Sequence, residues 1–313
     1  MPIFVRLRSS AGMSARFSLA RYEPMKMSLR VAVLSLKIAT LASVLLFLGG
    51  CNRIARSFYL SSYDRDINSA TKSIESARDT TQRAEAYAKR GSAYSEKARY
   101  SKAFKLISAD EYDRLFSLAI KDHDQAVALD PGRAEVYYTR GVTYYDRANL
   151  EAVVDGHLMG GDADRKAWFA PATADFKKAI ERNGQLYLAW DRLGLIHETT
   201  GEIDEAINDY TQEMALNPLG RARLADAYCT RGGSTSPKEK KNDAAISDFE
   251  KSIDLGATAD GCSCDPYYPL LWLYADGRRY DQAWVVVHKA QKSKKWIAPE
   301  MLDRLKKESG RTN

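Results

Sequence analysis

The stretch from Leu186 to Pro218 constrains the fold of this chain more than any other. Counted from Trp190, its characteristic residues stand at offsets of 0, 3, 4, 16, 20 and 28. They are Trp190, Leu193, Gly194, Ala206, Tyr210 and Pro218. Residues three or four apart share one face of an α-helix. Small residues at Gly194 and Ala206 let two helix backbones pass closely, and a proline ends the second helix. The pattern therefore predicts a pair of packed helices.

The pattern recurs on both sides of this stretch. In the first-helix motif, an aromatic residue is followed three and four residues later by Arg-Gly or Leu-Gly. This motif begins at Tyr87, Tyr137, Trp190 and Tyr228. The small residue that marks the second helix recurs at Ala119, Ala172, Ala206, Ala245 and Ala283. A helical unit repeated in this way predicts an all-α array of stacked helix pairs.

These residues resemble tetratricopeptide (TPR) repeats, which are about 34 residues long. The resemblance covers residues 61–295. It implies a TPR helix-turn-helix solenoid of about four to five repeats, two of them with long insertions. Ile67, Ala70, Ile74 and Ala77 lie on one face of an expected helix at 61–79, which fits a half repeat that caps the start of the array. Residues 296–313 are expected to form a capping helix, Pro299–Glu308, and a tail.

Two helix pairs have displaced second helices. About sixteen extra residues, around Ala98–Tyr112, separate the first pair, and about nineteen, around Arg147–Lys166, separate the second. Long insertions in repeats project to one face and often carry function. We therefore expect these two segments to form a second candidate interaction surface.

The last two units are expected to differ from each other. Gly232 and Gly233 should shorten one first helix, with a basic polar loop over 234–241 and an intact second helix over about 243–255. The next helix should be capped by Asp265 and Pro266 and should end at Gly277.

The N-terminus has the pattern of a secretory signal. Lys26, Arg30 and Lys37 accompany an apolar run that ends Leu48-Gly49-Gly50-Cys51. This ending resembles the lipobox of bacterial lipoproteins. The resemblance implies that residues 1–50 are a signal peptide, with a true start at Met25 or Met27, and that Cys51 is lipidated after cleavage. Residues 51–60 would then be a lipidated tether. Asn52 after the cysteine implies sorting to the outer membrane, facing the periplasm.

An alternative is an uncleaved anchor. The twenty residues of Val31–Gly50 could span a bilayer if the Lys37 ammonium reaches the interface. The protein would then be a single-span inner-membrane TPR protein that organises a complex by self-association, as a homo-oligomer.

The positive charge is confined to the N-terminus. The whole chain carries a net charge of +6, yet residues 1–50 hold seven Lys or Arg and one acidic residue, which leaves 40 of each sign in residues 51–313. Removal of the signal peptide removes the overall excess, and with it the argument for a nucleic-acid partner.

TPR arrays act as binding scaffolds, and the resemblance implies a partner-binding groove lined by the first helices. Transferred position by position, the groove residues are Tyr138, Val142, Tyr145, Leu188, Asp191, Leu195, Glu198, Tyr268 and Trp272, together with Ser92 and Ser95. An aromatic and aliphatic lining with two carboxylates suits an extended or helical peptide that carries a basic residue. The alternative is that these side chains pack against neighbouring helices. The expected function is an adaptor for envelope proteins or peptides.

The sequence offers little catalytic chemistry. There is no glycine-rich phosphate loop, no G-x-S-x-G and no HExxH, so we expect neither an enzyme nor a cofactor. Asp155, His157, Asp162 and Asp164 in the second insertion could bind a divalent ion, but their spacing fits no known site, and a solvated acidic loop is the simpler interpretation.

Three cysteines follow Cys51, at Cys229, Cys262 and Cys264. An oxidising periplasm permits a disulfide between adjacent repeats, joining Cys229 to either member of the C-x-C pair. The alternative is a C-x-C redox or metal pair.

The basic tail, 289–313, is either a solvated cap or a segment attracted to an anionic membrane or to peptidoglycan.

Overall fold

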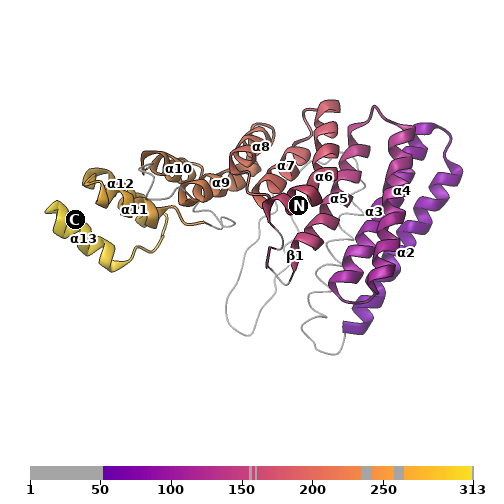
Figure 1. Cartoon of the computed structure of the whole chain (residues 1–313), viewed down its shortest axis with the longest axis horizontal. Helices are drawn as coiled ribbons and strands as arrows, with labels where there is room; N and C mark the ends of the chain where they lie inside the picture. The colour runs from indigo at the N-terminus through magenta and orange to yellow at the C-terminus, as the bar shows by residue number, and fades with distance from the viewer. Residues whose placement is uncertain (1–51, 155–156, 159–160, 235–241, 257–263, 312–313) are drawn as a thin grey trace, which may run out of the picture. The chain divides into compact units, whose positions relative to one another are not determined.

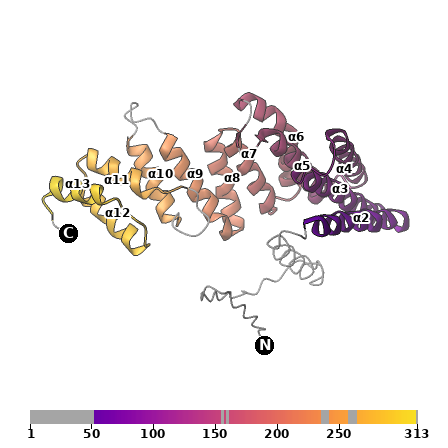
Figure 2. The same ribbon diagram turned by 90° about the horizontal axis from the view of Figure 1, so that it is seen from below.

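A computed structural model describes residues 52–154, 157–158, 161–234, 242–256 and 264–311. The chain forms two compact units, Met1–Tyr59 and Leu60–Asn313. Residues 1–50, predicted as a signal peptide, and Cys51, Asp155 and Cys262 lie outside the described residues. In the second unit, helices follow one another in chain order as successive pairs (Figures 1 and 2).

The first helices of the pairs are α3 (Thr80–Ala103), α5 (Ala134–Ala152), α7 (Tyr187–Thr199), α9 (Arg221–Ser234) and α11 (Tyr267–Asp276). The second helices are α4 (Ala109–Leu129), α6 (Asp162–Arg182), α8 (Ile203–Leu216), α10 (Asn242–Asp254) and α12 (Tyr280–Lys292). Helix α2 (Asn52–Ser76) precedes the pairs and α13 (Pro299–Ser309) follows them. A 3-10 turn, η1 (Pro218–Gly220), separates α8 from α9, so Pro218 ends a repeat as predicted. Each first helix packs on its own second helix, and from α5 onward also on the second helix of the pair before it. The predicted all-α solenoid fold is confirmed.

A glycine facing a ring holds each of the first four pairs together. Gly194 on α7 faces the fully buried ring of Tyr210 on α8, and a Cβ at Gly194 would overlap that ring. Gly141 faces Phe176 and Gly232 faces Phe249 in the same way, with an added Cβ 2.9 Å and 3.0 Å from the ring. The repeat signature therefore encodes a close helix–helix contact.

The fourth glycine faces a histidine. Gly91 lies against His123, which is fully buried and whose Nε2 is 3.0 Å from the Thr143 hydroxyl of α5. Burial, and then the nearby Arg140, lower the pKa of His123 to about 3. The imidazole is therefore neutral at neutral pH and fills the place that Phe or Tyr occupies in the other repeats.

Bidentate ion pairs accompany the glycines. The arginine before the glycine binds an aspartate on its second helix in three repeats, as Arg90–Asp122, Arg140–Asp175 and Arg231–Asp248, with N–O distances of 2.7–2.8 Å. Arg140 also reaches Asp124, and Arg231 reaches Asp204, on the preceding second helix. Each of these two guanidinium groups therefore joins three helices.

The repeat at 186–218 replaces this arginine with Leu193. Its aspartate, Asp209, instead accepts a bond from His197 Nδ1 at 2.6 Å. The buried carboxylate thus keeps a hydrogen-bonding partner although the ion pair is absent.

The two insertions are largely helical. Most of the first lengthens α3 and α4, which leaves only residues 104–108 between them. The second lengthens α5 and α6 around a two-stranded antiparallel ribbon, β1 (Val153–Val154) and β2 (His157–Leu158). The first insertion is helical because no glycine or proline interrupts residues 92–130, and its role as an interaction surface stays a prediction.

Two predicted helix boundaries were wrong. The helix expected at 61–79 is α2, which begins already at Asn52, so residues 52–60 of the predicted tether are helical; no glycine or proline interrupts α2. Helix α9 is not shortened, since it runs through Gly232 and Gly233 to Ser234. Packing of Gly232 on Phe249 offsets the low helix propensity of glycine there.

The end of the array follows the sequence closely. The Asp265 carboxylate accepts a bond from the Tyr267 amide at 3.0 Å, and Gly277 ends α11. The capping helix α13 is not only a solvated surface, because Met301 and Leu305 are buried against α11 and α12.

We predict that Gly194→Ala destabilises the array by about 1–3 kcal/mol, because the new methyl group overlaps the buried ring of Tyr210. Gly184→Ala is the matched control, since nothing lies within 4 Å of its added Cβ. Urea unfolding of both variants measures the difference. Equal midpoints for the two variants would contradict the role assigned to the Gly194–Tyr210 contact.

Candidate functional site

The predicted groove residues lie on the first helices with different exposures. Leu188, Tyr268 and Trp272 are exposed, with 37%, 47% and 40% of their surfaces accessible. Tyr138, Val142, Tyr145 and Leu195 are half-buried, and Ser95 is buried. The rings of Tyr138 and Tyr145 pack on Phe176 and Phe169 of α6, with centroids 5.8 Å and 5.6 Å apart. Packing against a neighbour therefore accounts for part of this set, and the exposed members remain candidates for contact with a partner.

Both predicted carboxylates have partners within the chain. Asp191, which is 8% exposed, pairs with Arg223 of α9 at 2.6 Å. Glu198 accepts a hydrogen bond from the buried Tyr210 hydroxyl at 2.9 Å. Each carboxylate that was expected to select a basic ligand therefore already has one partner within the chain, and contact with a ligand stays a prediction.

Arg192, which was not among the predicted groove residues, lies between Tyr138 and Tyr145. Its guanidinium is 5.3 Å from the centroid of the Tyr145 ring, and its Nε is buried without a hydrogen-bond partner. Burial acts to lower the pKa of Arg192, but Tyr138 and Asp191 hold it above the ordinary value, so the side chain stays charged. The equivalent positions of the other repeats are Lys89, Thr139, Thr230 and Pro269, so the repeat pattern gives no signal for an arginine here.

A second acidic side chain lies close to Arg192 on α5. Asp146 is half-buried and 3.6 Å from Arg99 of α3. Burial raises the pKa of Asp146, while Arg99 and Arg192 act against that rise. We call Tyr138, Tyr145, Asp191, Arg192 and Arg223 the central groove cluster.

Glu213 of α8 lies beside this cluster. It is 4% exposed, its Oε2 has no hydrogen-bond partner, and a Cβ at Gly220 would come within 2.7 Å of its carboxyl carbon. Burial, and then the nearby Asp191, raise the pKa of Glu213 to about 7. Glu213 therefore gains or loses a proton near neutral pH.

The chemistry of the central groove cluster is recognition. It offers guanidinium N–H donors and aromatic faces, which bind acceptor groups and side chains of a peptide. No nucleophile and base are paired in it. Within the described part of the chain, no group of three or more His, Cys, Asp or Glu side chains could hold a metal ion. Of the proposed metal residues, Asp164 instead caps α6 through the Gly161 amide at 3.0 Å.

Helix α11 presents a separate aromatic pair. Tyr268 and Trp272 meet edge to face with centroids 6.3 Å apart. Arg304 of α13 lies 4.6 Å from the centroid of the Trp272 ring and also binds Asp276 and Glu308. One face of this tryptophan is therefore covered by a cation that is itself held in place.

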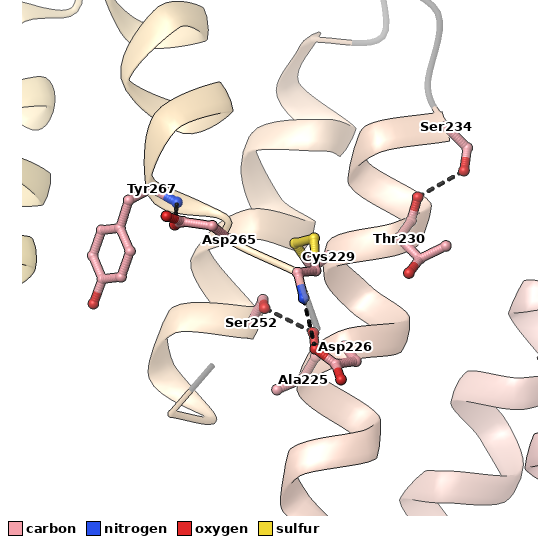
Figure 3. The surroundings of a disulfide bond; sticks show 9 residues. Ala225, Asp226, Cys229, Thr230, Ser234, Ser252, Asp265 and Tyr267 are labelled. Atoms are coloured by element: carbon pink, nitrogen blue, oxygen red, sulfur yellow. Dashed lines mark hydrogen bonds between the residues drawn. A yellow bond between two sulfur atoms is a disulfide. The ribbon is translucent and has the colours of Figure 1, made fainter. Parts of the chain in front are cut away.

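A disulfide joins Cys229 of α9 to Cys264, just before α11 (Figure 3). The two Cα atoms are 6.1 Å apart, and Cys229 is fully buried. The Cys264 amide also donates to Asp226 at 3.3 Å, and the Ser252 hydroxyl donates to the Ala225 carbonyl at 2.7 Å. A covalent bond therefore ties the last two helix pairs together.

Comparison with known proteins agrees with the repeat signature. Residues 187–218 match the family model described as tetratricopeptide repeat. This segment is a TPR repeat. No curated protein matches the chain in sequence.

Several solved structures are similar in fold. MamA is 21% identical, with 64% of this chain and 92% of MamA covered, at a TM-score of 0.39. YrrB, described as a TPR protein with an unusual peptide-binding site, is 17% identical, with 78% and 93% covered, at 0.38. A thermophilic TPR protein of Thermus thermophilus is 19% identical, with 74% and 95% covered, at 0.38. Similarity at this level says nothing about the ligand of this chain.

We predict two additional thiols per chain when the denatured protein is reduced, because Cys229 and Cys264 are released. Cys264→Ser should abolish this gain and lower the free energy of unfolding by about 2–4 kcal/mol. Cys262→Ser is the control and should keep both the gain and the stability. Equal thiol counts with and without reductant would contradict the bond.

Proposed function

We propose that this protein is a membrane-anchored adaptor that binds an envelope protein or peptide along the exposed face of its first helices. A TPR fold suggests a protein–protein interaction adaptor. The observation that carries the proposal is the central groove cluster, where the half-buried guanidinium of Arg192 lies between Tyr138 and Tyr145 and its Nε has no hydrogen-bond partner. Unmet hydrogen-bonding capacity in a recognition surface is a place for a ligand to bind.

The cluster favours a ligand with acceptor groups at its centre and an apolar side chain beside them. Arg192 supplies the charged donor, while Asp191 is occupied by Arg223 at 2.6 Å. Leu188, one turn before Arg192 on α7, is 37% exposed and offers an apolar contact. An extended peptide supplies both features, through its carbonyl or carboxylate oxygens and its side chains.

We predict that a photo-crosslinking residue at Leu188 captures a protein partner in bacterial envelopes. The same probe at Asn208, exposed on the second helix α8, is the control and should capture none. Arg192→Gln should reduce the Leu188 adduct about tenfold, since a hydrogen bond to a charged group is lost. Arg182→Gln, at the exposed end of α6, should not reduce it. Equal adducts at 188 and 208, or no effect of Arg192→Gln in a variant with normal thermal unfolding, would contradict the proposed site.

The anchor rests on the sequence alone, because Cys51 and the residues before it lie outside the described ones. Among the residues that the structure does describe, no helix is long and apolar enough to cross a membrane. The proposal is that acyl chains on Cys51 hold the protein on the outer membrane, facing the periplasm.

We predict that globomycin, which inhibits lipoprotein signal peptidase, causes an unprocessed precursor to accumulate, and that Cys51→Ser does the same. The mature protein from untreated cells should fractionate with membranes and have a mass that lacks residues 1–50 and includes acyl chains. Membrane association with residues 1–50 retained in untreated cells would instead support the uncleaved single-span alternative. A soluble, unlipidated protein would contradict both.

A further inference from the structure

A short loop between α12 and α13 places a tryptophan in solvent. Trp296 has 76% of its surface exposed. The indole is amphipathic, with a large apolar body and one N–H donor, and such residues are enriched where one end meets an apolar phase and the other meets water. We call residues 292–296, Lys-Ser-Lys-Lys-Trp, the lysine–tryptophan loop.

The residues on either side hold Trp296 outside the fold. Ile297 packs against the core formed by α11, α12 and α13, and Ala298 is only 9% exposed. On the other side, α12 ends in a Schellman motif, in which the Lys294 amide bonds the Gln291 carbonyl at 3.0 Å and the Lys295 amide bonds the Ala290 carbonyl at 2.9 Å. Lys294 takes a φ of +55° to make this turn. Because both flanks are fixed, the backbone at Trp296 is held at the surface, where the indole is exposed.

The loop also carries unpaired positive charge. Lys292 and Lys294 are exposed and Lys295 is half-buried, and none of the three forms an ion pair within the described residues. Other basic residues of this region differ, because Lys289 pairs with Asp254, Arg304 with Asp276, and Arg311 with Asp281.

The remaining charges of α13 lie further along the chain. Glu300 and Asp303 are exposed acidic residues in its first half, and Lys306 and Lys307 are exposed basic residues in its last turn. The local excess of positive charge is therefore centred on the loop.

We propose that the lysine–tryptophan loop docks on an anionic lipid surface. The Trp296 indole would lie at the boundary between headgroups and acyl chains, and the ammonium groups of Lys292, Lys294 and Lys295 would contact lipid phosphates. Tryptophan is enriched at this depth, and basic residues beside an apolar insertion are drawn to anionic leaflets. The contact would fix the C-terminal end of the array at a membrane, independently of the groove and of the anchor.

A lipid surface fits the loop better than the other polyanions. Binding to single-stranded nucleic acid combines a basic track with several stacking rings, whereas here one ring projects alone and residues 51–313 carry equal numbers of acidic and basic residues. An acidic protein surface would need only the charges and gives no reason for a fixed, projecting indole.

The test uses the full chain reconstituted in vesicles, so that any N-terminal anchor is the same in every sample. Lipids brominated in the acyl chain quench tryptophan emission. With brominated phosphatidylglycerol at about 30 mol% in phosphatidylcholine, we expect quenching that disappears in Trp296→Phe and weakens with added salt. Vesicles of brominated phosphatidylcholine alone should give no Trp296-dependent quenching.

Replacement of Lys292, Lys294 and Lys295 by Gln should lower the ratio of vesicle-bound to free loop about 100-fold, because each lysine contributes about a fivefold factor. Gln at Lys72, Lys121 and Lys177, three exposed lysines elsewhere in the array, is the matched control and should leave quenching unchanged. Equal Trp296 quenching in neutral and anionic vesicles, or no change in the loop variant, would overturn the proposal. A photo-crosslinker at Ser293 in envelopes should give lipid adducts, and adducts with protein alone would overturn the proposal in favour of an acidic protein partner.

Discussion

The close contact between a glycine and a ring is the constraint on which this structure depends. Gly194 against Tyr210, Gly141 against Phe176 and Gly232 against Phe249 set the separation of the helices in three pairs. Gly91 against His123 does the same in another, with an imidazole kept neutral by burial. The contact fixes the rotation of each first helix about its axis, because only one face carries the glycine. That rotation decides which side chains of α5 and α7 meet the solvent, so the composition of the central groove cluster follows from it.

The arginine–aspartate pairs add a second level of order. Arg140 and Arg231 each bind the second helix of their own pair and that of the preceding pair, so the same guanidinium fixes both the fold of a repeat and its stacking on the next. The repeat at 186–218 lacks this arginine, and the ion pair of its first helix, Asp191–Arg223, runs to α9 in the following repeat. This ion pair lies in the central groove cluster, beside Arg192 and the protonatable Glu213.

The sequence predicted the fold well because short-range spacing encodes it. Gly194, Ala206 and Tyr210 lie within one repeat, and their offsets determine which residues meet. The candidate site was less predictable. Asp191 and Arg223 belong to different repeats, and no local pattern shows that they pair or that Glu198 accepts a bond from Tyr210. The insertion at 98–112 was identified by its length, but its helical conformation follows from an almost uninterrupted run without glycine or proline.

The Cys229–Cys264 bond changes how the end of this solenoid should open. Repeat arrays are held by nearest-neighbour interfaces, so the terminal units are the first to fray. Here the bond fastens α9 to the residues before α11, and α13 buries Met301 and Leu305 against the same core. The last two pairs and the capping helix should therefore open as one cooperative block or remain closed together. Reduction would let the last pair and the capping helix, α11 to α13, open separately from α9 and α10. The redox state of the compartment therefore sets how much of the array a proteolytic enzyme can reach from its C-terminal end.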